Sequence, residues 1–63
     1  MKYYRVDAET LKEEEITREE FMERVSRYYP DIDTVMHEID IGRLYDIRTP
    51  FAVYKVSDPF HDD

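Results

Sequence analysis

The sequence predicts an α+β fold: a small β-α-α-β-β domain in which a three-stranded antiparallel sheet is covered by one or two helices. Two observations carry this prediction. Segments rich in aromatic and branched residues stand near both ends of the chain, and a strongly capped helical pattern lies between them. The 63 residues suffice for one domain. We assign it to residues 1–57 and expect residues 58–63 to be a flexible acidic tail.

The first strand is expected at residues 2–6, where KYYRV places Tyr4 and Val6 on one face and Tyr3 and Arg5 on the other. Residues 7–15 lose this alternation and gather acidic side chains. They are expected to form either a connecting loop or one or two loose helical turns.

The first helix is expected from Arg18 to Tyr28. Thr17 and Glu20 have the spacing of a capping box, in which each side chain satisfies the other residue's backbone N–H, and Ile16 and Phe21 occupy the matching hydrophobic-staple positions. Pro30 ends the helix because it disfavours helical geometry in the residue before it. The inward stripe is predicted to be Phe21, Val25, Tyr28 and Tyr29.

Residues 31–41 fit two patterns. Helical spacing joins Ile32, Val35, Met36 and Ile39, whereas strand alternation joins Val35, His37, Ile39 and Ile41. An N-cap at Asp31 and a left-handed cap at Gly42 favour the helix, in which His37 is exposed.

Two strands are expected after Gly42. Residues 43–48 (RLYDIR) and 51–56 (FAVYKV) form a hairpin through Thr49 and Pro50. Because FAVYKV is apolar on both faces, it is predicted to be the central strand, with KYYRV on one side and RLYDIR on the other.

Composition limits the partners and the compartment. Sixteen acidic residues against nine Lys and Arg give a net charge of −7, which disfavours direct binding to nucleic acid or to an anionic membrane. Cys is absent, and we find no signal peptide, long apolar run or lipidation motif, so we expect a cytoplasmic protein. The oligomeric state is left open.

No catalytic residue, metal ligand or cofactor is assigned. Ser26 and Ser57 lack a nucleophile context, and the acids of residues 31–40 lack the pattern of a calcium loop, so we expect a protein that is not an enzyme. Tyrosines on the strands of a sheet can also form a base-stacking platform. The tyrosines (Tyr3, Tyr4, Tyr45 and Tyr54) are better explained as core and sheet cover.

The acids are concentrated near the N-terminus. Residues 7–23 hold eight carboxylates against Lys12 and Arg18, a net −6. Such a surface either confers solubility alone or resembles the regularly spaced charge of a nucleic-acid backbone and occupies a basic protein groove. The candidate partner-binding residues are Glu13, Glu14, Glu15, Glu19, Glu20 and Glu23.

The KYYRV opening and the ITREEF helix start in a short acidic chain resemble the accessory proteins of bacteriophages and mobile elements, a loose group that includes anti-CRISPR and other host-inhibiting proteins. The resemblance implies a phage or mobile-element setting and a protein inhibitor, and it identifies no target. Together with the acidic surface it leads to the hypothesis of a DNA-mimicking inhibitor in the host cytoplasm that blocks a basic nucleic-acid-binding surface on a host defence protein. It carries over no site residue. The alternative function is a small structural or assembly module that pairs with itself or another chain through its aromatic sheet.

Overall fold

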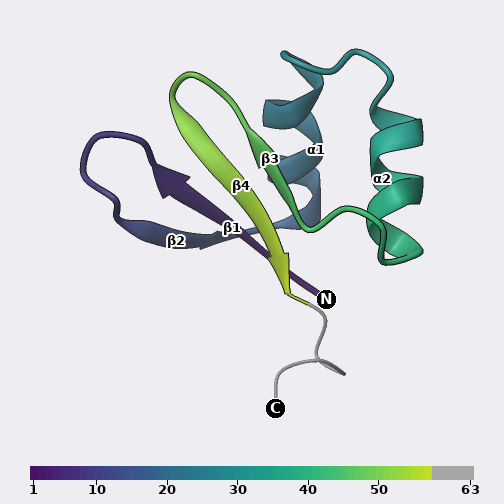
Figure 1. Ribbon diagram of the computed structural model, residues 1–63, viewed down its shortest axis with the longest axis horizontal. Coiled ribbons are helices and arrows are strands. Elements are labelled where there is room, and N and C mark those ends of the chain that lie inside the picture. Colours follow the sequence, from purple (N-terminus) through teal and green to yellow (C-terminus); the bar gives the residue numbers. More distant parts are fainter. Residues whose placement is uncertain (58–63) are drawn as a thin grey trace.

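Four strands and two helices follow one another in the computed structural model, which describes residues 1–57 (Figure 1). The α+β class predicted from the sequence is confirmed. The tail expected at residues 58–63 lies outside the described residues. In chain order the elements are β1 (Lys2–Asp7), β2 (Glu13–Ile16), α1 (Arg18–Ser26), α2 (Ile32–Asp40), β3 (Asp46–Arg48) and β4 (Ala52–Ser57).

The sheet has one strand more than the sequence predicted. Its order is β2-β1-β4-β3, and every neighbouring pair is antiparallel. The central placement of β4 between β1 and β3 is confirmed. The connecting loop expected over residues 7–15 is confirmed for residues 8–12 only. The expectation is wrong at its two ends, because β1 extends to Asp7 and Glu13–Ile16 pairs with β1 as an edge strand.

The β1–β2 hairpin is set by the turn that follows β1. Asp7 Oδ1 accepts hydrogen bonds from the backbone N–H groups of Glu9 and Thr10, at 2.8 and 3.0 Å, which is the local capping that Asp supplies in turns. Leu11 then adopts a positive φ of 61°. The resulting register places Ile16 opposite Tyr3. Both side chains are buried, so burial of Ile16 anchors a strand whose other residues are glutamates.

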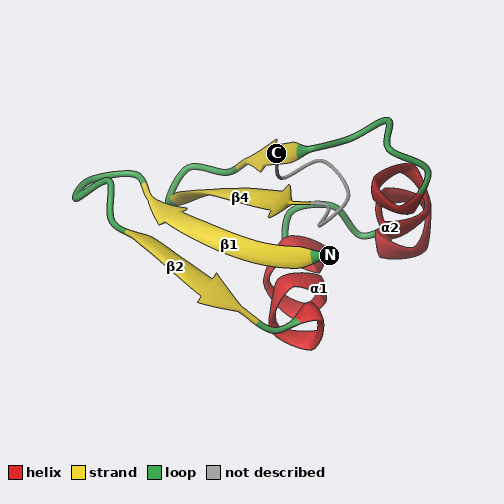
Figure 2. Cartoon of the chain, turned by 90° about the horizontal axis from the view of Figure 1, so that it is seen from below, coloured by secondary structure: helices red, strands yellow, loops and turns green. Residues whose placement is uncertain are grey.

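Both helices lie against the same face of the sheet (Figure 2). That face contributes buried side chains from all four strands, and the helices add Phe21, Val25, Met36 and Ile39. The Phe21 ring is fully buried and lies 5.0 Å from the Tyr3 ring and 6.0 Å from the Tyr54 ring, measured between centroids. The sheet residues of this core are Tyr3, Ile16, Ile47, Ala52 and Tyr54.

Helix α1 begins as predicted and ends early. The Thr17 hydroxyl accepts from the Glu20 N–H at 3.1 Å and Glu20 Oε1 accepts from the Thr17 N–H at 3.2 Å, so the capping box is present. The helix stops at Ser26. The backbone N–H groups of Tyr28 and Tyr29 both donate to the carbonyl of Val25. The prediction that these tyrosines complete the inward stripe is wrong, since they are 39% and 42% exposed.

Helix α2 resolves the ambiguous block in favour of a helix. Asp31 caps it by accepting from Thr34 N–H, Met36 and Ile39 are buried, and His37 is exposed. Gly42, with φ of 78°, ends it, and the N–H groups of Arg43 and Leu44 return to the carbonyl of Glu38. This termination uses part of the segment expected as a strand, so β3 is only Asp46–Arg48 rather than residues 43–48.

Candidate functional site

The six candidate glutamates lie on two consecutive elements rather than on one helix face. Glu13, Glu14 and Glu15 make up most of β2, while Glu19, Glu20 and Glu23 belong to α1. Thr17 alone separates the two elements. We call the surface formed by these six residues the acidic edge.

The acidic edge lies at the side of the sheet. β2 pairs with β1 on one side only, so among the described residues its other side has no strand partner. Successive strand side chains point to opposite faces. Because Ile16 is buried under α1, Glu14 lies on the helix-covered face, and Glu13 and Glu15 lie on the open face. A molecule that approaches β2 from the side therefore meets carboxylates above and below the strand.

Three of the six carboxylates are paired with cations. Glu13 accepts from Lys55 Nζ at 3.0 Å, Glu20 from Arg24 at 3.4 Å, and Glu23 from Arg27 at 2.8 Å. In each of the latter two pairs the partners lie one helical turn apart on α1. Glu20 also accepts the backbone hydrogen bond of the capping box.

The other three carboxylates (Glu14, Glu15 and Glu19) are exposed. Within residues 1–57 they have no hydrogen bond or ion pair. They therefore form the uncompensated part of the acidic edge, and they lie around the junction of β2 and α1.

Arg18 holds this junction in place. Its guanidinium donates to the Tyr3 hydroxyl at 2.6 Å and to the Asp40 carboxylate at 3.5 Å. The hydrogen bond with Asp40 raises the pKa of Arg18, and burial opposes that rise. The start of α1 is thereby tied to both β1 and the end of α2, which fixes Glu19 relative to β2.

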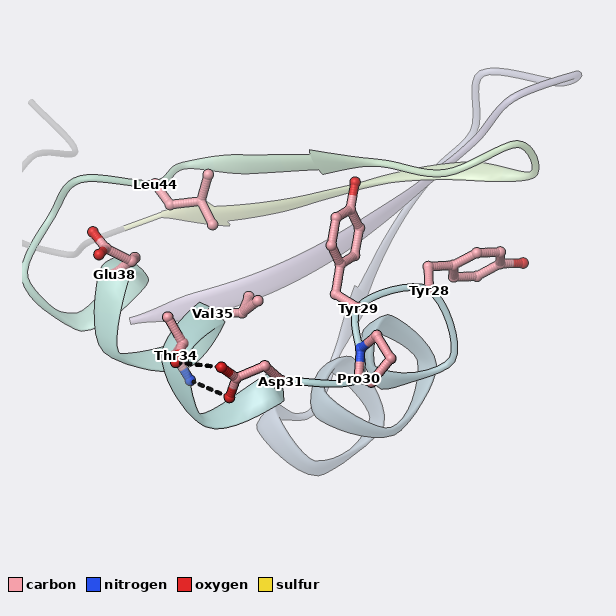
Figure 3. Close-up of a pocket in the computed structure, with 8 residues that line it drawn as sticks. All are labelled: Tyr28, Tyr29, Pro30, Asp31, Thr34, Val35, Glu38 and Leu44. Carbon is pink, nitrogen blue, oxygen red and sulfur yellow. Dashed lines mark hydrogen bonds between the residues drawn. The ribbon is translucent and has the colours of Figure 1, made fainter.

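An apolar hollow of about 290 Å³ lies on another part of the molecule, between the end of α1 and the start of α2. Val35 on α2 and Leu44 after it face the hollow, and Tyr29 stands beside them (Figure 3). The Tyr29 hydroxyl donates to the carbonyl of Arg48 at 3.3 Å. The hollow does not follow from the sequence pattern, because that pattern places Tyr29 in the core. The exposed Tyr28-Tyr29-Pro30 run was the signal for it.

The stacking platform weighed from the sheet tyrosines does not form. Tyr3 and Tyr54 are buried beneath the helices, Tyr4 is half-buried on the opposite face, and Tyr45 precedes β3. The explanation of Tyr3 and Tyr54 as core residues is confirmed. Tyr45, at 58% exposed, is not a core residue.

Two further properties bear on the kind of site. Across the part of the chain that the structure describes, no three His, Asp or Glu side chains are grouped in a way that could hold a metal ion. Neither of the helices has the length and apolar character needed to cross a membrane. Comparison of the chain with protein-family models, curated proteins and solved structures gave no match.

Proposed function

We propose that this protein is a non-enzymatic inhibitor that binds a basic protein surface through its acidic edge. The fitting target is a groove that normally holds DNA or RNA, because such a groove carries closely spaced Lys and Arg side chains. A host defence protein is the target class, and a phage or mobile element is the genetic setting. That setting rests on the resemblance of the chain's opening residues alone.

One observation carries the proposal: Glu14, Glu15 and Glu19 are exposed and uncompensated at one place, while nearby carboxylates have cationic partners. An unpaired carboxylate loses no internal ion pair when it meets a partner's cation. Long-range attraction between this edge and a basic groove accelerates encounter and makes binding salt-sensitive.

The alternative, self-association through the sheet, is disfavoured by the charge on β2. A second copy added antiparallel to this edge would place glutamates of one β2 opposite glutamates of the other. Directly opposed like charges destabilise strand pairing, and charged residues on edge strands are a common protection against it. β3, the other edge, has only three residues.

The test is affinity capture from the cell that naturally contains the protein, followed by binding measurements on the retained partner. The decisive variant carries Glu14→Lys, Glu15→Lys and Glu19→Lys, which leaves the capping box and the five ion pairs of residues 1–57 intact. We expect it to fold and to lose binding.

The matched control carries Glu9→Lys, Asp33→Lys and Glu38→Lys. It changes the net charge by the same amount, and Asp33 occupies the same first-turn position in α2 that Glu19 occupies in α1. The control should retain binding. Equal loss in both variants would show an effect of net charge alone, and unchanged binding in both would leave the acidic edge as a solubilising surface.

A further inference from the structure

A second site, rich in arginine, lies between the last turn of α1 and the sheet. Arg5 of β1 and Arg24 and Arg27 of α1 line one hollow of about 450 Å³, together with Glu23 and three aromatic residues (Tyr28, Phe51 and Tyr54). The lining therefore carries three positive charges and one negative charge. Each of these arginines also pairs with a carboxylate, so the surroundings of the hollow are close to neutral in a protein whose net charge is −7.

The three guanidinium groups keep donors available. Each contacts one carboxylate through a single nitrogen: Arg5 with Asp7 and Arg24 with Glu20 at 3.4 Å, and Arg27 with Glu23 at 2.8 Å. A guanidinium has five N–H donors in a planar fork that matches phosphate oxygens. Several donors from three side chains therefore remain for an anion in the hollow.

Any anion held here is held by these arginines. The hollow adjoins the end of α1, where the helix dipole is negative and opposes an anion. Arg5 lines the hollow from β1, and hydrogen bonding to Tyr54 raises its pKa while burial opposes that rise. Arg5 thus stays charged throughout the physiological range, and removal of one arginine should have a direct effect on binding.

An aromatic surface adjoins the cations. Phe51, in the turn between β3 and β4, lines the hollow and is 66% exposed, and Tyr28 lines it at 39% exposed. An exposed ring beside guanidinium groups suits a ligand that combines a planar ring with a phosphate, because bases stack on aromatic faces. The volume lies within the range of small-molecule sites.

We propose that this arginine groove binds a nucleoside monophosphate, with the phosphate on Arg24 and Arg27 and the base on Phe51. A small dianion suits the site better than a nucleic-acid strand, because the many phosphates of a strand would meet the long-range repulsion of the whole acidic protein. The site shares one residue with the acidic edge, Glu23, which pairs with Arg27 through a single nitrogen and leaves the other donors of Arg27 for the phosphate.

The experiment is a titration of the isotope-labelled protein with AMP at constant ionic strength. Binding is monitored by NMR of the backbone amides and the arginine side chains. Three comparison ligands are titrated in the same way. Adenosine lacks the phosphate, inorganic phosphate lacks the nucleoside, and an N-acetyl phosphotyrosine amide carries its phosphate on a different ring. We expect AMP to shift resonances of Arg5, Arg24, Arg27 and Phe51 and to bind at least about tenfold more tightly than either half.

Two exposed substitutions test the contacts without disturbing the core. Arg27→Gln and Phe51→Ala should each weaken AMP binding about tenfold, which is the scale of one charge-assisted hydrogen bond or one stacking contact. The control variants Arg43→Gln and Tyr45→Ala remove a guanidinium group and an aromatic ring from exposed positions outside the groove. They should leave AMP binding unchanged.

Three results would overturn the proposal. The first is the absence of saturable shifts in the groove, and the second is equal weakening by the groove variants and their controls. The third is tighter binding of inorganic phosphate or phosphotyrosine amide than of AMP, which would assign the groove to another anion. The groove shares Glu23 with the acidic edge, but the uncompensated carboxylates that carry the proposed function, Glu14, Glu15 and Glu19, do not line it, so these results leave that proposal to its own test.

Discussion

Glu13 of β2 and Lys55 of β4 form an ion pair of 3.0 Å across the intervening strand β1. Both side chains lie on the sheet face that the helices leave open, and both are about half exposed, at 51% and 48%. The pair links the acidic edge to the central strand. It also neutralises one of the six glutamates that the sequence predicts as partner-binding residues.

The Glu13–Lys55 pair is expected to contribute little to stability. Lys55→Gln should lower the free energy of unfolding by less than about 1 kcal/mol, because solvent and salt screen half-exposed charges. Urea denaturation at low salt and in about 1 M NaCl measures this, and the loss should vanish at the higher salt concentration. A double-mutant cycle with Glu13→Gln isolates the pair. A loss that persists in high salt would point to packing of the lysine stem instead.

The centre of the core should be far more sensitive. Phe21 is fully buried between Tyr3 and Tyr54, so Phe21→Ala should cost about 3 to 5 kcal/mol. Thr17→Ala removes only the N-cap and should cost about 1 kcal/mol. Because a small domain has little stability to lose, denaturation should be followed in a stabilising osmolyte. Equal losses for the two variants would contradict the central place of Phe21.

Thr17 and Phe21 show which parts of the fold short-range sequence signals determine. The capping box, the Asp31 cap and Gly42 are short-range signals, and each is found where the sequence predicted it. Burial of Phe21 followed from its spacing to Val25. Local sequence therefore placed both helices and the central position of β4.

β2 could not be predicted in the same way. Glutamate is depleted in strands, and EEE shows no alternation; the strand forms because the Asp7 turn sets the hairpin and Ile16 gains burial opposite Tyr3. The pairing of Glu13 with Lys55, 42 positions apart, follows from sheet order alone. The arginine groove depends equally on long-range packing, since Arg5 and Arg24 come from different layers.

The turn that sets this hairpin should be sensitive to acid. Hydrogen bonds from the N–H groups of Thr10 and Glu9 lower the pKa of Asp7 below its ordinary value of 3.8. A carboxyl with a lowered pKa contributes stability that is fully present above its unfolded-state value and is lost as the pH falls through the folded-state value. The contribution of Asp7 should therefore decline below about pH 3.8.

Asp7→Asn provides the comparison, because an amide oxygen accepts the same two hydrogen bonds without titrating. The difference in unfolding free energy between the two proteins, followed by denaturation from about pH 6 to pH 2.5, should shrink in the acid range. A constant difference over this range would mean that the Asp7 charge does not contribute to folding.

The glutamates of β2 should also keep the protein from pairing with itself. In a variant with Glu13→Thr, Glu14→Thr and Glu15→Thr, the edge keeps its unpaired backbone groups, gains a residue favoured in strands and loses its charge. Sedimentation should show this variant associating as concentration rises, while the native protein stays monomeric. A control with Glu9→Gln, Asp33→Asn and Glu38→Gln removes the same charge away from β2 and should also stay monomeric. If the native protein is itself dimeric, the charge on β2 does not prevent association, and the assembly module becomes the better account of its function.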